Sequence, residues 1–410
     1  MPHSIRLPGM ILTDHTIEVP VDHSDPSGAT LTVFAREVSA PGGADKPYLL
    51  FLQGGPGGEG PRPAVPLGGW HARALEDFRL LLLDQRGTGL STPVGSLPGM
   101  TPQEQADYLV HFRADSIVRD AELLREHLGV EQWSLLGQSF GGFCSLHYLS
   151  AFPGSLREVF FTGGVPPVGL PVDEVYRATY ARMQELTEGH YQRFPGDRDR
   201  MRQIAAECER GAITLPNGVP LTTHRLQTLG SGLGMTGGSE ALHFLLERDP
   251  ASPRFVSDVY DAVPFGGSMP IYTVLHEACY ADGGATRWSC DRVRPSEYDS
   301  DVALFTAEHP FPWHLNETPE LSPLADAAHL LAEHEWPRLY DEDALRRAEV
   351  PCAAAIYYDD PFVLREHSMA TAELLPQMRP WISNEWLHNG IRAGGPDVLD
   401  RLIRMTRGEI

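Results

Sequence analysis

One short stretch, in which an apolar strand, a glycine-rich turn and a helix follow without a break, constrains the fold most. The apolar residues 132–136 lead directly into the pentapeptide GQSFG at 137–141, and a helical pattern follows over 143–152. Another apolar run, 158–162, comes next. A strand, a helix and a second strand in this succession place the two strands parallel in one sheet. The chain is therefore predicted to have an α/β fold.

The same alternation appears on both sides of this stretch. Two runs that are almost wholly apolar, 48–52 and 79–83, each end in a glycine-rich turn, as strands of a covered parallel sheet do. Near the C-terminus the pattern predicts strands at 352–358 and 380–383 and a closing helix over 396–407. We therefore expect a mostly parallel, doubly wound sheet.

The start and the middle of the chain depart from that pattern. Alternating apolar and polar residues at 16–21 and 30–35 predict an antiparallel hairpin at the edge of the sheet. Between 164 and 340 helical segments predominate, and no strand-turn-helix unit stands out. We predict a main domain formed by residues 1–163 and 341–410, and a mainly helical inserted domain formed by residues 164–340, which we call the cap.

Charge and hydropathy exclude two classes of partner. The formal net charge of −22, with no lysine- or arginine-rich stretch to offset it, would repel a phosphate backbone, so no nucleic-acid partner is expected. No apolar run approaches the roughly 18 residues that a membrane span needs, so no membrane association is expected. The sequence leaves the oligomeric state open.

The cysteines and the N-terminus both indicate a reducing compartment. Five cysteines, an odd number without a C-x-x-C pair, favour neither a disulfide framework nor a zinc site. The first residues lack the basic and apolar pattern of an export signal. A cytoplasmic location is therefore predicted.

The pentapeptide at 137–141 matches G-x-S-x-G, a turn that holds a nucleophilic serine clear of a sheet. Small residues beside the serine let the chain turn sharply from strand to helix. In a chain with 40 glycines, an ordinary glycine turn is the alternative interpretation. The position between an apolar strand and a helix favours the first, so Ser139 is predicted to be a catalytic nucleophile.

A serine hydroxyl needs a base that takes its proton and a carboxylate that orients the base. After a serine on such a turn, the acid and then the histidine follow in chain order. His388 lies after the last predicted strand, just before the closing helix, and is the predicted base; His367, expected on a helix surface, is the alternative. Asp359 and Asp360 both close the strand at 352–358, and their position alone does not choose between them.

A tetrahedral intermediate also needs donors for its oxyanion. The turn QGGPGG at 53–58 follows the strand at 48–52 and offers backbone N–H groups that no side chain obstructs. We predict that the N–H groups of Gly55 and Phe140 form the oxyanion hole. A phosphate-binding loop is the alternative, but the Walker spacing and its lysine are both missing. Neither a cofactor nor a metal is therefore expected.

Three motifs in this order resemble the prolyl aminopeptidase (proline iminopeptidase) family. Its members carry H-G-G-P-G, D-Q-R-G-x-G-x-S and G-x-S-x-G-G, and this chain reads QGGPG at 53–57, DQRGTGLS at 84–91 and GQSFGG at 137–142. The length, the extended cap and the sequence NGIR at 389–392 are similar to the larger subgroup, so the resemblance spans nearly the whole chain. Gln53 stands where the family has histidine, a change that backbone donors survive.

The resemblance implies an α/β-hydrolase fold and a metal-free serine aminopeptidase that releases N-terminal proline from short peptides through an acyl-enzyme. It implies that the triad acid precedes an apolar pair, which fits Asp360, followed by PFV at 361–363, better than Asp359. It further implies that Arg86, in the D-Q-R-G segment, pairs with a carboxylate rather than taking part in catalysis.

The resemblance also implies that glutamates of the cap bind the ammonium group of the substrate. Glu277 resembles one such position, and Glu247 and Glu240 are further candidates. Two other functions stay open: another capped hydrolase, acting as an esterase, an amidase or a broader aminopeptidase, and a non-catalytic binding protein on the same fold. Missing triad residues would indicate the second, and none is missing from the sequence.

Overall fold

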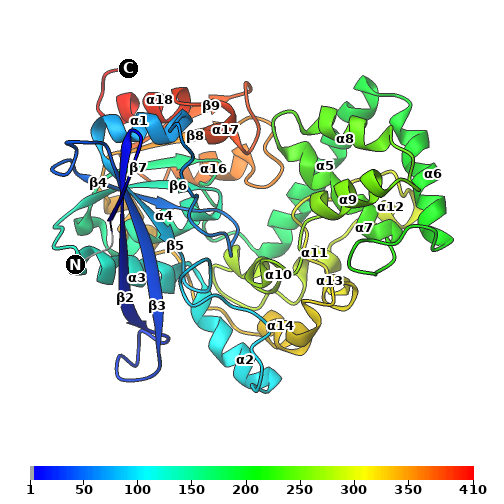
Figure 1. Ribbon diagram of the computed structural model, residues 1–410, viewed down its shortest axis with the longest axis horizontal. Coiled ribbons are helices and arrows are strands. Elements are labelled where there is room, and N and C mark those ends of the chain that lie inside the picture. The colour runs from blue at the N-terminus through cyan, green and yellow to red at the C-terminus, as the bar shows by residue number, and fades with distance from the viewer. Residues whose placement is uncertain (1–3) are drawn as a thin grey trace.

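The computed structural model describes residues 4–410. Its centre is one sheet with the strand order β1-β2-β3-β5-β4-β6-β7-β8-β9 (Figure 1). The strands are β1 (Ser4–Leu7), β2 (Met10–Pro20), β3 (Thr30–Ser39), β4 (Tyr48–Leu52), β5 (Arg79–Asp84), β6 (Trp133–Gln138), β7 (Leu156–Thr162), β8 (Cys352–Tyr357) and β9 (Met378–Ser383). The pairs β1–β2, β2–β3 and β3–β5 are antiparallel. All later pairs in this order, from β5–β4 to β8–β9, are parallel. The mostly parallel sheet predicted from the sequence is confirmed.

The central strands are apolar on both faces because helices cover both faces of the sheet. In β4, Leu50 and Leu52 belong to the core on one side, whereas Leu49 and Phe51 belong to the core on the other. The covering helices are α3 (Ala114–His127) and α4 (Phe140–Ala151) on the first side, and α1 (Gly69–Asp77) and α18 (Asp397–Thr406) on the second. Burial of this kind contributes roughly 1.5–3 kcal/mol for each large apolar side chain.

The N-terminal hairpin forms as predicted, but it does not end the sheet. β2 and β3 pair antiparallel in the register Ile17 opposite Val33. β1 lies outside them and pairs with the first residues of β2, across a turn at Gly9 with a φ of 80°. The prediction of the hairpin as the edge is therefore wrong, because β1 is too short and too exposed to show an apolar pattern.

The chain between β7 and β8 adds no strand to the sheet within the described residues. It forms α5 (Val172–Arg193), α6 (Asp197–Glu209), α7 (Thr223–Gln227), α8 (Gly238–Leu246), α9 (Pro253–Ala262), α10 (Pro270–Val274), α11 (Ser289–Arg292), α12 (Glu297–Ser300), α13 (Trp313–Glu317), α14 (Ala325–Ala332), α15 (Glu342–Arg347) and the 3-10 helices η3 (Thr228–Gly234), η4 (Glu277–Cys279) and η5 (Ser322–Leu324). Helices α5 to α13 stand to one side of the sheet (Figure 1). No helix in residues 4–410 is long and apolar enough to cross a membrane.

The predicted boundaries of the cap stay predictions. Helix α2 (Pro102–Leu109), which belongs to the predicted main domain, packs against α14 of the cap. The predicted main domain also contains α15, α16 (Arg365–Ala372), α17 (Gly390–Ala393), η1 (Val110–Phe112) and η2 (Pro153–Ser155).

Three strands end at the same edge of the sheet and deliver the residues on which the site depends. Parallel strands point the same way, so the segments that follow them meet at one edge. Ser139 directly follows β6, Asp360 lies just after β8, and His388 lies in the loop after β9. Residues that are far apart in sequence are thereby brought to one place.

Candidate active site

Ser139 occupies a strained turn between β6 and α4. Its φ of 55° is unusual for a residue with a side chain, and such strain is typical of a nucleophile held clear of a sheet. The two glycines of the pentapeptide make the turn possible. A Cβ at Gly137 would collide with the carbonyl oxygen of Gly141, and a Cβ at Gly141 with that of Leu52. The G-x-S-x-G pattern is thus a direct requirement of close backbone packing.

His388 joins Ser139 to Asp360 through two hydrogen bonds. Its Nε2 lies 2.8 Å from the Ser139 Oγ, and its Nδ1 lies 2.7 Å from Asp360 Oδ2. The second Asp360 oxygen accepts from the backbone N–H groups of Phe362 and Val363, at 2.9 and 3.1 Å. Asp360 is 1% exposed and His388 3%, so water is largely excluded from this chain of side chains.

The surroundings of His388 favour its protonated form. Burial by itself lowers its pKa, but the charge of Asp360, the hydrogen bond to it and the charge of Glu308 raise the pKa above the usual value. The ring of Phe362 packs edge-on against the imidazole, with centroids 4.8 Å apart. The imidazole is therefore fixed in orientation and can accept a proton from Ser139.

Asp359 and Asp360 are adjacent, but they point to different partners. Asp359 Oδ1 lies 3.1 Å from Arg182 of α5, and its side chain is 47% exposed. Asp360 alone of the two bonds to His388. His367, the alternative base, lies in α16. The geometry thus distinguishes two carboxylates between which sequence position did not choose.

The predicted oxyanion loop lies against the nucleophile. A Cβ at Gly54 would stand 2.8 Å from that of Ser139, and Gly55 has a φ of 130° that favours glycine. The carbonyl of Gln53 accepts a hydrogen bond of 2.9 Å from Gln85 Nε2. Gln85, which sequence analysis did not assign, therefore anchors this loop through its backbone.

Arg86 pairs with a carboxylate, as the resemblance implies. Its guanidinium is buried and donates to both oxygens of Asp120, with the Nε bond at 2.7 Å. It also donates to the carbonyls of Val21 and His111. Arg86 therefore ties the residue after β2 to η1 and α3.

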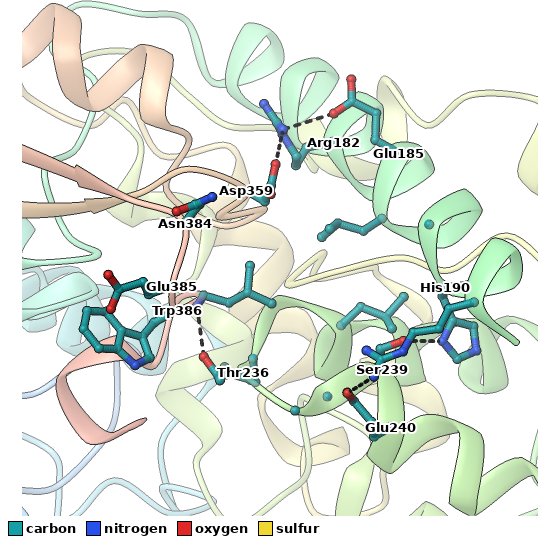
Figure 2. A pocket seen from close by; sticks show the side chains of 18 residues that line it. Arg182, Glu185, His190, Thr236, Ser239, Glu240, Asp359, Asn384, Glu385 and Trp386 are labelled. Carbon is teal, nitrogen blue, oxygen red and sulfur yellow. Dashed lines mark hydrogen bonds and ion pairs between the residues drawn. The ribbon is translucent and has the colours of Figure 1, made fainter. Parts of the chain in front are cut away.

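The three cap glutamates predicted to bind substrate have different partners. Glu277 is buried and accepts a bond of 2.8 Å from the backbone N–H of Cys290 inside the cap, and burial raises its pKa. Glu247 is exposed and lies 3.3 Å from His243. Glu240 pairs with Arg193 at 2.5 Å, on the rim of a cleft of about 490 Å³ (Figure 2). None of these contacts, among the described residues, involves the triad.

Glu308 is a carboxylate near the triad that sequence analysis missed. Burial raises its pKa, while the charge of His388 and a hydrogen bond from Tyr272 act in the opposite direction. Its charge in turn raises the pKa of His388, and its partner Tyr272 lies on α10, against the oxyanion loop. It lies in the irregular segment between α12 and α13, where no motif or periodicity marks it.

Aromatic rings of the cap line the same region. The rings of Phe265 and Tyr272 stack with centroids 4.7 Å apart, and His276 packs edge-on against Tyr272 at 5.1 Å. A Cβ at Gly57 of the oxyanion loop would stand 3.0 Å from the Tyr272 backbone nitrogen, so α10 lies directly against that loop. In residues 4–410, no group of three or more His, Cys, Asp or Glu side chains is arranged to hold a metal ion.

Comparison with known proteins shows similarity to relatives along nearly the whole chain. The chain is 47% identical over 419 residues to a proline iminopeptidase of Aeromonas sobria, covering 98% of each chain. It is 33% identical over 421 residues to the proline iminopeptidase aneH of Aspergillus aculeatus, covering 96% of this chain and 93% of that protein. Residues 47–210 match the family described as alpha/beta hydrolase fold. The predicted fold class is confirmed.

Proposed function

Because this chain belongs to the proline iminopeptidase family of α/β-hydrolases, we propose that Ser139, His388 and Asp360 carry out its reaction, the release of N-terminal proline from a peptide. The observation that carries the proposal is the unbroken chain of hydrogen bonds from the Ser139 hydroxyl through the imidazole to the Asp360 carboxylate. Three segments that are distant in sequence supply the three groups a serine hydrolase needs.

In the first half of the reaction, Ser139 Oγ attacks the proline carbonyl and His388 Nε2 takes the hydroxyl proton. The raised pKa of His388 supports this step, since the nearby Asp360 carboxylate stabilises the imidazolium that forms. The N–H groups of Gly55 and Phe140 stabilise the oxyanion. The C–N bond then breaks, and His388 returns its proton to the leaving amine. An ester joins proline to Ser139.

In the second half, water takes the place of the amine. His388 removes a proton from this water as it attacks the ester carbonyl. The second tetrahedral intermediate then collapses to free proline, and His388 gives its proton to the departing Ser139 Oγ. Atoms and protons balance without any further reactant. The groups used are one alcohol, one imidazole, one carboxylate and two backbone N–H groups.

Glu308 is the proposed partner of the substrate's ammonium group. In an N-terminal proline the charged nitrogen is bonded to the carbon next to the scissile carbonyl, so its partner must lie close to the triad. The electrostatic effect of Glu308 on His388 supports such a position. Burial disfavours the lone carboxylate charge, and an ammonium ion would compensate it. Glu277, already bonded to Cys290, is proposed as a supporting carboxylate; substrate contacts of Glu240 and Glu247 stay predictions.

The cap is proposed to restrict the enzyme to peptide ends. Its helix α10 lies against the oxyanion loop, and Tyr280 donates a bond of 3.2 Å to the carbonyl of Phe362, beside the imidazole. Cap residues thus lie against both the oxyanion loop and the segment beside the imidazole, which supports this role. Short peptides with a free N-terminal proline are the proposed substrates.

A cytoplasmic location is proposed from the state of the cysteines. All five are free and buried: Cys144, Cys208, Cys279, Cys290 and Cys352. A protein that keeps five thiols without a disulfide fits a reducing compartment.

The experiment that tests the function compares proline, alanine and ester chromogenic substrates for the wild-type enzyme and Ser139→Ala. We expect the proline substrate to be preferred and the variant to lose about 10⁴-fold or more in kcat. An ester preferred over the proline amide would favour the esterase alternative. Undiminished turnover by Ser139→Ala would contradict the proposed mechanism.

A further inference from the structure

We propose that Gly234 and Thr236 of the cap are positioning residues, which hold the loop that carries His388 in register with Ser139. The inference rests on the proposed function, because it assigns these residues a part in keeping the triad assembled. It is carried by hydrogen bonds that run from the cap to the loop between β9 and α17, residues 384–389.

Two consecutive backbone donors of this loop bond to the cap. The N–H of Leu387 donates to Thr236 Oγ1 at 2.9 Å, and the N–H of His388 donates to the carbonyl of Gly234 at 3.0 Å. In the opposite direction, the N–H of Thr236 donates to Asn389 Oδ1 at 2.9 Å. Three bonds thus join cap residues two apart to three successive residues of the loop. His388 itself is the central one.

The loop has no regular secondary structure of its own at this point. β9 ends at Ser383 and α17 begins at Gly390. Without a helix or strand to fix it, the position of His388 depends on what the loop contacts. Figure 2 shows Thr236 facing the end of this loop. Both Thr236 and the loop line a cleft of about 490 Å³ that lies between the cap and the loop. The bonds at Thr236 therefore bridge the two walls of a cleft.

Gly234 also packs against Phe362, whose ring lies beside the imidazole of His388. A Cβ at this position would collide with the ring of Phe362, the ring that packs edge-on against His388. A glycine here lets the cap backbone lie close enough to accept from the His388 N–H. The same cap segment thus borders His388 through its backbone and through Phe362.

The three triad residues are consequently held by different parts of the molecule. Ser139 is fixed by the sheet, where its N–H donates to the Thr162 carbonyl at 3.1 Å. The segment of Asp360 is held at its flanks by the cap, through Arg182 on Asp359 and Tyr280 on Phe362. A displacement of the cap relative to the sheet would therefore change the distance from Ser139 Oγ to His388 Nε2. The cap is in this way part of the support of the catalytic base.

Thr236→Val tests the proposal, because valine keeps the shape of threonine and removes the acceptor for the Leu387 N–H. We expect kcat for a proline anilide to fall about three- to tenfold, the value of one hydrogen bond, with KM changed less than twofold. Thr236→Ser keeps the hydroxyl and should restore kcat. Asn389→Ala, which removes the reciprocal acceptor, should lower kcat by a similar factor, and the double variant should lose less than the product of the two.

A sulfonyl fluoride that reacts with Ser139 supplies a readout independent of substrate binding by the cap. Its reaction needs the serine and the base but no peptide, so Thr236→Val should slow it by the same factor as kcat. Thr222→Val is the matched control, because Thr222 caps α7 and bonds to Glu317 wholly within the cap. We expect it to lower the thermal midpoint while leaving kcat and the sulfonylation rate unchanged.

Three results would overturn the proposal: an unchanged kcat in Thr236→Val, a rise in KM alone, or an equal loss of kcat in Thr222→Val. The first would show that the bonds are dispensable, the second that they act on substrate, and the third that any weakening of the cap has the same effect. A different result would contradict the proposed function alone: the wild-type protein would not cleave proline anilides, while its sulfonylation would still depend on Thr236.

Discussion

The sheet and the cap of this molecule differ in how their sequences relate to their roles. In the sheet, residues 132–152 form the predicted strand, turn and helix, and the position of Ser139 follows from the close packing of two glycines. In the cap, helices form as predicted, but Glu308 and Thr236, which lie near the triad or its loop, sit in irregular segments. Local sterics determine the position of the nucleophile. The proposed ammonium site and the position of the His388 loop depend instead on contacts between residues that are distant in sequence.

The sharpest test of the sheet side is a comparison of two adjacent carboxylates. Asp360→Asn should lower kcat about 10⁴-fold, because the imidazole loses the partner that fixes its tautomer and stabilises its charge. Asp359→Asn should change kcat by less than about tenfold, the value of a partly exposed ion pair with Arg182. Steady-state kinetics on a proline anilide measures both. Equal losses would mean that the two carboxylates are not distinguished as the geometry indicates.

The cap side is tested by its glutamates. Glu308→Gln should lower kcat/KM for proline substrates about 10²-fold, since an ammonium group would lose its partly buried partner. Glu207→Gln is the control, because Glu207 lies on α6 of the cap and pairs with Arg210, and we expect it to stay within twofold. Glu277→Gln should fall between them. A Glu308→Gln enzyme with full kcat/KM would contradict the assignment of the ammonium site and leave Glu277 as the candidate.

The pH profile connects the two regions, because a cap carboxylate raises the pKa of a histidine on the sheet side. His388 acts as a base only when neutral, so kcat should decline as the pH falls through its raised pKa, above the ordinary value for histidine. Glu308→Gln removes one of the charges that raise this pKa, so the midpoint should move to lower pH. An unchanged midpoint of the pH profile would show that the charge of Glu308 does not act on His388.

The smallest expected effect is that of a chelator. The proposed mechanism uses only side chains and backbone groups of this chain, so prolonged treatment with EDTA should leave kcat unchanged. Activity that is lost on chelation and regained on addition of a divalent cation would contradict the proposed mechanism.

Sequence patterns predicted the central strands, the turn that carries Ser139 and the chain order of serine, acid and histidine, because each depends on local periodicity or local sterics. They did not choose between Asp359 and Asp360, because that choice depends on which way a turn directs two neighbouring side chains. Glu308 was missed for a related reason. A single glutamate without a motif is usually solvated, and only tertiary packing brings this one near His388.

β1 and Gln85 show the same limit on the sheet side. β1 is four residues long and mostly exposed, so its pairing with β2 leaves no apolar alternation in the sequence. The role of Gln85 comes from one side-chain bond to the carbonyl of Gln53, 32 residues earlier. Both features are produced by the fold rather than by a pattern within their own segments.

The burial of all five thiols makes the wild-type chain nearly silent toward maleimide dyes. Burial raises the pKa of each thiol, to about 12 for Cys208, so little reactive thiolate forms at neutral pH. Cysteines introduced as Glu185→Cys and Glu385→Cys, on opposite walls of the cleft, would then be the sites that take up a donor and an acceptor fluorophore. Energy transfer between them would follow the separation of cap and sheet during single turnovers.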